Sequence, residues 1–311
     1  MVRARSKLRT IIGRVKDTTA IAKAFVTSKR VFYQAQRAVV QATSFSDRHT
    51  PPPQSKLLEV ISAGKISRPA TAAVVRSLID RLHCTRDAYV ALKCLYTIHT
   101  VLQNGSLDAK RELLSYGGRN SMIMATFRDK TDSDAWELSS WVRWYASVIE
   151  QQLKASLVPS FQLWANGDHA TRKRLPGSEV SPLATSDLIS GLGVLVVLLE
   201  LLSEAPPSLQ QTSLVYEVVR LVSYDYGSTQ KNILMLMEEV EDRVSDLGCE
   251  EMGMVANMLS RVESCKEKLG LLFLNRNRHD AYWEKMGELS IKYGLAIRDK
   301  TERMSLVVHG T

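Results

Sequence analysis

The chain has 311 residues, of which 45% are hydrophobic and 24% charged, and its mean hydropathy is −0.12. This composition is typical of a folded, water-soluble protein and excludes a disordered one. The formal net charge is +8, but residues 1–49 alone carry 11 Lys or Arg and two acids, a net +9, so the remainder sums to −1. A charge this uneven indicates that the N-terminal end meets a polyanion, either nucleic acid or the anionic face of a membrane.

Apolar residues recur at helical spacing through most of the chain, and no alternating run bounded by turns predicts a strand. Near the start, Leu8, Ile11, Ile12 and Val15 fall at positions i, i+3, i+4 and i+7 among basic side chains. This spacing predicts a short basic amphipathic segment. The stretch 44–55 contains three consecutive prolines and is therefore predicted to be a loop.

Further breaks mark the starts of later helices. Ser67 precedes Arg-Pro and is placed to cap a helix, because proline is favoured in the first helical turn. A second helix is predicted from near Asp87 to Asn104-Gly105, and a third begins at 132–134 and carries three tryptophans.

Prolines, glycines and Arg172-Lys173-Arg174 predict a long loop or linker over residues 156–186. Short helices precede this loop and longer ones follow it. We therefore predict an all-α fold in which a helical superhelix over residues 1–155 continues, past the loop, into a helical bundle over residues 187–303. The bundle segments are expected near 187–204, 208–240, 250–273 and 279–300.

Sequence motifs of catalysis and metal binding are missing. No H-E-x-x-H, G-x-S-x-G or P-loop pattern occurs, and the four cysteines form no C-x-x-C pair. His99, on an apolar helical face, is interpreted as a packing residue. We therefore expect a non-enzymatic protein with no cofactor or metal. The longest apolar run, Val194–Leu199 extended to Leu202, is far shorter than the ~20 residues that cross a bilayer, so membrane contact is expected at the surface only.

The residue types in the basic segment favour a membrane over nucleic acid. Nucleic-acid readers add a groove-entering helix or aromatics among the cations, and this segment holds only four aromatics. A phosphoinositide headgroup needs cationic side chains and hydroxyls that converge from neighbouring helix ends. The stretch from Arg37 to Lys56, with Thr43, Arg48 and His49 between, has this composition. The alternative that these charges are only the solvated faces of amphipathic helices stays open.

Several motifs together resemble one known family. Gln41-Ala42-Thr43, a spacer and then Pro51-Pro52-Pro53-Gln54-Ser55-Lys56-Leu57 are similar to the Lys-Ala-Thr and Pro-Lys-x-Lys-His motifs of the ANTH domain, the lipid-binding module of clathrin-assembly proteins. The stretch from Trp136 to Tyr145 resembles the plant members. Further similar stretches lie at 81–83, 91–95, 118–120, 127–129 and 263–266, so the resemblance covers about residues 20 to 300.

The resemblance implies an ANTH/VHS-like superhelix that binds phosphatidylinositol 4,5-bisphosphate at the cytosolic leaflet. Of the residues that hold the headgroup in the family, Thr43 and Lys56 are kept here, while Gln41 replaces the first lysine and the rest of the second motif is lost. Arg37, Arg48 and His49 lie near enough in sequence to replace them. Four cations near the start are expected to add non-specific attraction to acidic lipid: Arg3, Arg5, Lys7 and Arg9.

The expected partners are an acidic phosphoinositide membrane, clathrin and SNARE proteins, with no nucleic acid. Clathrin binding is expected to be weak, because the sequence lacks the family's Asp-Leu-Leu-type hooks. Its nearest match, Asp187-Leu188-Ile189, is interpreted as a helix start with core residues. The expected location is cytoplasmic and peripheral on the plasma membrane, in clathrin-coated pits and vesicles, or at the Golgi. The alternative function is an ANTH-derived scaffold with weak lipid selectivity that binds SNARE or other protein helices.

Overall fold

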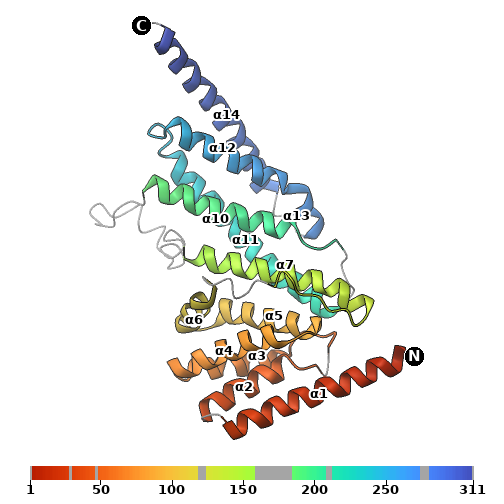
Figure 1. The fold of residues 1–311 in the computed structure, drawn as a ribbon. Helices are drawn as coiled ribbons and strands as arrows, with labels where there is room; N and C mark the ends of the chain where they lie inside the picture. The colour runs from red at the N-terminus through yellow and green to blue at the C-terminus, as the bar shows by residue number, and fades with distance from the viewer. Residues whose placement is uncertain are drawn as a thin grey trace. The chain divides into compact units, whose positions relative to one another are not determined.

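The computed structural model confirms the all-α prediction, because every regular element that it describes is an α-helix (Figure 1). The helices fall into two compact units. Unit 1 comprises Met1–Leu153 and Pro206–Leu221, and unit 2 comprises Lys154–Ala205 and Val222–Thr311. The described residues are 2–27, 30–45, 48–117, 124–157, 184–207, 212–273 and 280–309.

Unit 1 is a stack of helices in chain order, seen from α1 to α7 in Figure 1. Within it, α1 packs on α2, the helices α2, α3 and α4 pack on one another, and α5 packs on α3, α4 and α6. The bounds are α1 (Val2–Thr27), α2 (Arg30–Ala42), α3 (Gln54–Lys65), α4 (Arg68–Cys84), α5 (Ala88–Asn104), α6 (Leu107–Gly117) and α7 (Ser133–Ser156).

Side-chain caps fix where the central helices begin. The Ser67 hydroxyl accepts a hydrogen bond from the Ala70 amide at the start of α4, as its sequence predicts. At the start of α5 the Asp87 carboxylate accepts from two amides in the first turn. A second carboxylate, that of the buried Asp129, accepts from the Ala88 amide over 3.0 Å. Two acids at one helix start also suit the positive end of the helix dipole.

The core of unit 1 is built around α5, which is buried continuously from Ala88 to Val101. His99 belongs to this buried face, where Nδ1 lies 2.8 Å from the Tyr145 hydroxyl of α7 and Nε2 lies 3.1 Å from the Gln103 amide. The interpretation of His99 as a packing residue is thus confirmed. Trp141 of α7 is fully buried in the same core.

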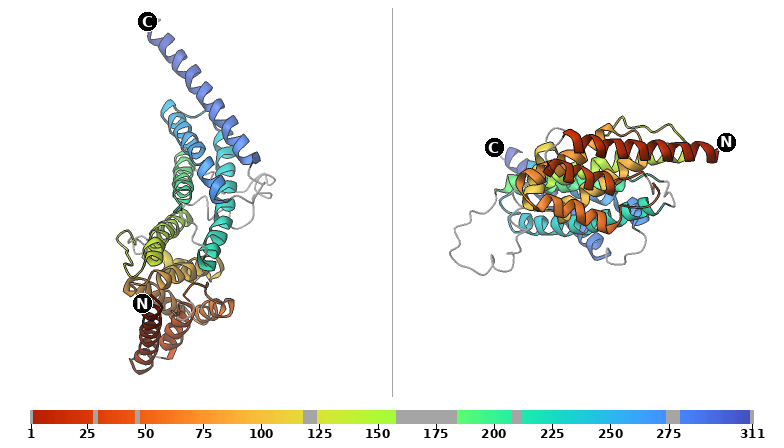
Figure 2. Two further views of the ribbon diagram at one scale, coloured as in Figure 1. Left: turned by 90° about the vertical axis from the view of Figure 1, so that its right-hand side faces the viewer. Right: turned by 90° about the horizontal axis from the view of Figure 1, so that it is seen from below.

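Unit 2 contains α14, the longest of the described helices, which lies beside α12 (Figures 1 and 2), but α1 and α7 of unit 1 are longer than α10 and α12, so the predicted change from short to long helices is wrong. The α10 helix packs on α12 and α13, and the Arg261 guanidinium binds both carboxylate oxygens of Glu200 at 2.7 Å. The predicted segment 250–273 is divided at Cys265 into two helices. The bounds are α10 (Thr185–Ser203), α11 (Ser213–Glu241, in unit 2 from Val222), α12 (Cys249–Ser264), α13 (Lys266–Leu272) and α14 (Asp280–His309).

By length and composition alone, α10 is long and apolar enough to cross a membrane, although its contiguous apolar run near 194–202 is short. The helix extends from this run toward the N-terminus across small and polar residues, so the count of contiguous apolar residues understated the length of the apolar helix. However, half of the most apolar 18-residue stretch of α10 is buried, and Glu200 of this helix is paired with Arg261, as in a core helix. Leu188 and Ile189 are buried behind an exposed Asp187, which confirms their interpretation as a helix start with core residues.

Some predicted features lie outside the described residues. These are most of the loop predicted over 156–186, including Arg172-Lys173-Arg174, and the family-like stretch 118–120. Of the loop predicted over 156–186, the structure describes only residues 156–157, at the end of α7, and residues 184–186, at the start of α10.

Candidate functional site

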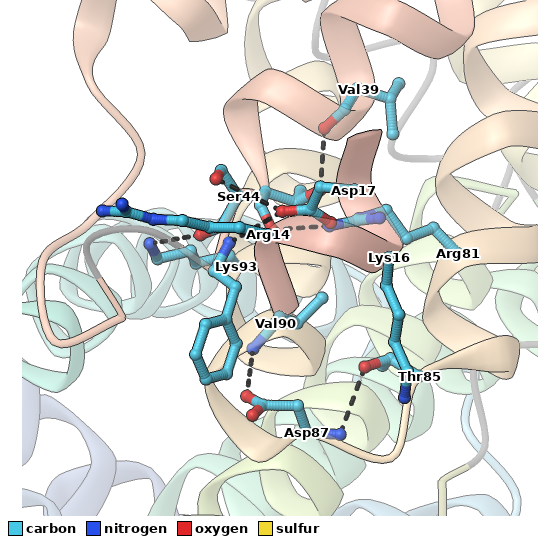
Figure 3. Close-up of polar contacts among 12 residues, drawn as sticks. Arg14, Lys16, Asp17, Val39, Ser44, Arg81, Thr85, Asp87, Val90 and Lys93 are labelled. Atoms are coloured by element: carbon cyan, nitrogen blue, oxygen red, sulfur yellow. Dashed lines mark hydrogen bonds and ion pairs between the residues drawn. The ribbon is translucent and has the colours of Figure 1, made fainter. Parts of the chain in front are cut away.

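The connection after α2 is held in place by an ion pair between α1 and α4 (Figure 3). Nη2 of Arg81 lies 2.7 Å from Oδ1 of Asp17 and also donates to the Thr43 carbonyl over 3.0 Å. The other carboxylate oxygen of Asp17 accepts from the Ser44 hydroxyl and from the Phe45 amide. One carboxylate therefore attaches α1 to the connection, in a largely buried place where charge-assisted hydrogen bonds are strong.

Thr43, the residue that matches the family motif, faces inward. Its side chain is fully buried, and its hydroxyl donates to the Val39 carbonyl over 2.7 Å. The buried Lys93 of α5 donates to the Ser44 carbonyl over 3.0 Å. Thr43 thus ends α2 and shapes the connection, and its hydroxyl is not presented to solvent.

The two motif positions Gln41 and Lys56 are brought together, although 15 residues separate them. Nζ of Lys56 donates to the Gln41 side-chain oxygen over 3.2 Å and to the Glu59 carboxylate over 2.7 Å. Arg37 is exposed on α2, one turn before Gln41 on the same face. The structure therefore brings Gln41 and Lys56 together, with Arg37 one helical turn away on α2, and Glu59 offsets the charge of the lysine.

Arg48 and His49 lie against a different set of residues. The Arg48 guanidinium is 3.6 Å from the Asp132 carboxylate, which precedes α7, and 4.7 Å from the centre of the Tyr89 ring. His49 meets the same ring edge-on at 4.7 Å, and its backbone carbonyl accepts from the Leu214 amide at the start of α11. This arrangement anchors the loop to α5, to the residue before α7 and to the start of α11.

The pKa of His49 is lowered, first by partial burial and then by the neighbouring Arg48. Both effects disfavour the charged form of His49, so it is a weaker source of positive charge for a headgroup site than an unperturbed histidine.

The N-terminal cations Arg3, Arg5, Lys7 and Arg9 belong to α1, and their side chains are outside the described residues. The next turns of α1 carry an exposed apolar stripe of Ile11, Ile12 and Val15, with exposed fractions of 59%, 47% and 55%. The exposed Arg14 and Lys16 flank this stripe. The sequence marks the amphipathic spacing, but only the structure shows that the apolar side faces solvent.

A cleft of about 710 Å³ between α1, α2 and α4 is a further feature that the sequence does not reveal. Lys16 and Asp17 line it from α1, Phe32 from α2, and Arg81 and Cys84 from α4. Its charges are mixed, so it has no clear preference for an anion or a cation. In the part of the chain that the structure describes, no group of three or more metal-binding side chains occurs.

Comparison with known proteins links this sequence to one family. A family model of the ANTH domain matches residues 34–175. An Arabidopsis thaliana protein named "Putative clathrin assembly protein At4g40080" is 35% identical over 83% of this chain and 73% of its own length. A second from the same plant, "Putative clathrin assembly protein At5g10410", is 30% identical over 88% of this chain and 82% of its own length. The matched part is only 34% of a third, "Putative clathrin assembly protein At5g57200", which is 31% identical over 69% of this chain.

Proposed function

Because this chain belongs to the ANTH-domain family of clathrin assembly proteins, we propose that it is a non-enzymatic adaptor that attaches to acidic phosphoinositide membranes during clathrin-coat assembly. Its place in this proposal is the cytosolic face of the plasma membrane, in coated pits and vesicles. The names of the relatives supply the link to clathrin. The link to lipid rests on the surface of unit 1.

The observation that carries the lipid proposal is the exposed stripe of α1. A helix that presents apolar side chains beside cations lies in the interface of an anionic membrane, with its apolar face among the acyl chains. Ile11, Ile12 and Val15 supply the apolar face, and Arg14 and Lys16 supply cations at its border. Each cation near an anionic surface contributes about 1 kcal/mol, so the attachment is peripheral and reversible.

Headgroup selectivity in this proposal comes from the place where α2 ends and α3 begins. Arg37 and Lys56 are the cations there, and Gln41 offers an amide where the family has a lysine. Because Glu59 already binds Lys56, a phosphate must compete with that carboxylate. Arg48 is similarly engaged by Asp132. We therefore infer weaker selectivity than a site with unpaired lysines would have.

Co-sedimentation with liposomes of equal net charge tests both parts. One set contains phosphatidylserine and the other phosphatidylinositol 4,5-bisphosphate. Ile11→Asp should reduce binding to both sets, whereas Lys56→Gln should reduce only the excess binding to the bisphosphate. Ile66→Asp is the matched control, because Ile66 is 67% exposed elsewhere in unit 1. Unchanged binding by Ile11→Asp would refute attachment through α1.

A second candidate function is supported by a different observation, in unit 2. Ile291 and Leu295 lie one turn apart on α14 and are 68% and 56% exposed, and Met254 of α12 is 42% exposed. Apolar side chains one helical turn apart are suited to packing against a partner helix, such as that of a SNARE. A pull-down with cytosolic SNARE helices should then fail for Ile291→Asp. The control is Leu271→Asp on α13, where the residue is 67% exposed.

A further inference from the structure

Two arginines from different elements of unit 1 meet at one backbone oxygen. Nη1 of Arg143, on α7, donates to the Phe127 carbonyl over 3.0 Å. Nη1 of Arg128, in the connection before α7, donates to the same oxygen over 2.8 Å. The two nitrogens are therefore no more than about 6 Å apart. Each guanidinium carries five N–H donors, and most of them are not used in these contacts.

In the described ranges the two guanidiniums donate to backbone carbonyls, those of Phe127 and Ala125, and neither forms an ion pair with a carboxylate. Asp129, the acid adjacent in sequence, is buried, and its carboxylate accepts from the Ala88 amide and from Thr131. The pKa of Arg143 is lowered by burial and then by the charge of Arg128. The fold thus holds two positive charges close together, and a bound anion would relieve their repulsion.

We propose that Arg128 and Arg143 form a binding site for a phosphate monoester group. Two converging guanidiniums bind the oxygens of one tetrahedral anion through paired hydrogen bonds. A phosphate dianion cancels both charges, whereas one carboxylate cancels only one. Arg128 is exposed, so the site is open to solvent, and the exposed Lys130 follows two residues later on the same connection.

This site is separate from the motif at Gln41 and Lys56, because it is built from α7 and the connection that precedes α7. The phosphate group has two possible sources, a soluble phosphate ester or a lipid headgroup, and both present the same chemistry to the arginines. The test therefore needs one soluble and one membrane-bound form of the same group.

Calorimetric titration of the full chain with inositol 1,4,5-trisphosphate provides the soluble arm. It is done in a Lys56→Gln background, so that the motif region does not contribute. Arg128→Gln should weaken binding at least tenfold and should leave the fold intact, because this side chain is exposed. Arg111→Gln is the matched control, since Arg111 is 76% exposed on α6 and its loss changes the net charge equally. Sodium acetate at equal ionic strength should not compete.

Vesicles that contain phosphatidylinositol 4,5-bisphosphate provide the second arm. If Arg128→Gln weakens both soluble and vesicle binding, the site takes a lipid headgroup. If it weakens only soluble binding, the site takes a soluble ester. Equal affinity of the Arg128→Gln and control proteins for inositol trisphosphate, or no binding by either, would overturn the proposal. Attachment through α1 is tested separately by Ile11→Asp, which leaves both arginines in place.

Discussion

Replacing Arg81 with methionine should loosen the attachment of α1 while the remainder of unit 1 stays folded. Arg81 joins Asp17 of α1 at 2.7 Å to the Thr43 carbonyl at 3.0 Å, and both charged side chains are only 15% exposed. Methionine keeps the packing of the arginine stem but removes both hydrogen bonds. Asp17 would then keep only its contacts to the Ser44 hydroxyl and the Phe45 amide, at 3.3 and 3.2 Å.

The size of the effect follows from these contacts. A hydrogen bond to a charged group contributes about 1.5–3 kcal/mol, and removal of one partner of a fully buried ion pair costs about 3–5 kcal/mol. Because Asp17 retains two donors and some contact with water, we expect a loss of about 2–3 kcal/mol in the free energy that holds α1 in place. That loss corresponds to an increase of about 30- to 150-fold in the opening equilibrium.

Hydrogen exchange measured by mass spectrometry checks this expectation on the amides near Asp17 and Phe45. They should exchange faster in Arg81→Met by about that factor, whereas the buried amides of α5 should not change. Arg76→Met on the same helix is the control, because its ion pair with Asp80 spans 3.9 Å and both side chains are more than 60% exposed. Equal exchange of α1 in the two variants would refute the argument.

Three further predictions concern other contacts of unit 1. Gly13→Ala should lower the free energy of unfolding by about 1–3 kcal/mol, and with it the melting temperature, because the added Cβ would lie 2.5 Å from the buried Phe45 ring. Gly64→Ala is the control and should leave the melting temperature unchanged, because the space around Gly64 is open. Because the pKa of His49 is lower in the folded chain than in the unfolded chain, the unfolded chain binds more protons on acidification. The stability that neutral His49 contributes is therefore present above pH 6.5 and is lost as the pH falls through its folded-state pKa. His49→Gln should therefore flatten the fall in melting temperature between pH 7 and pH 5, and an unchanged slope would contradict this. Burial raises the pKa of the Cys94 thiol to about 11, so at pH 8 iodoacetamide should modify the exposed Cys84 much faster, and equal rates by mass spectrometry would count against the buried position.

Features set by local chemistry could be predicted from the sequence. The Ser67 cap, the start of α5 after Asp87 and the proline-containing loop before α3 depend on residues within a few positions of each other. Both Gln41 and Lys56 stand in the family-like motif, and in the structure Nζ of Lys56 lies 3.2 Å from the side-chain oxygen of Gln41.

Contacts between distant residues could not be predicted in the same way. The carboxylate opposite Arg48 belongs to Asp132, and the one opposite Arg81 belongs to Asp17, 64 residues away. Such ion pairs leave no periodic pattern in a single sequence, because only the packing of several helices brings them together. For the same reason, the sequence could identify cations for a headgroup site but not the acids that already engage them.

The hydrogen bonds that His49 accepts have a consequence for how this chain is made. Its carbonyl accepts from the Leu214 amide and the Ser213 hydroxyl, across a separation of 164 residues for the latter. Unit 1 is therefore not contiguous, and residues 206–221 complete it only after the whole of α10 has been synthesised. Domains otherwise begin to fold from the N-terminus as they leave the ribosome. In the nascent chain, the hydrogen bonds that hold the proline-rich loop at His49 can therefore form only after the start of α11 has been synthesised.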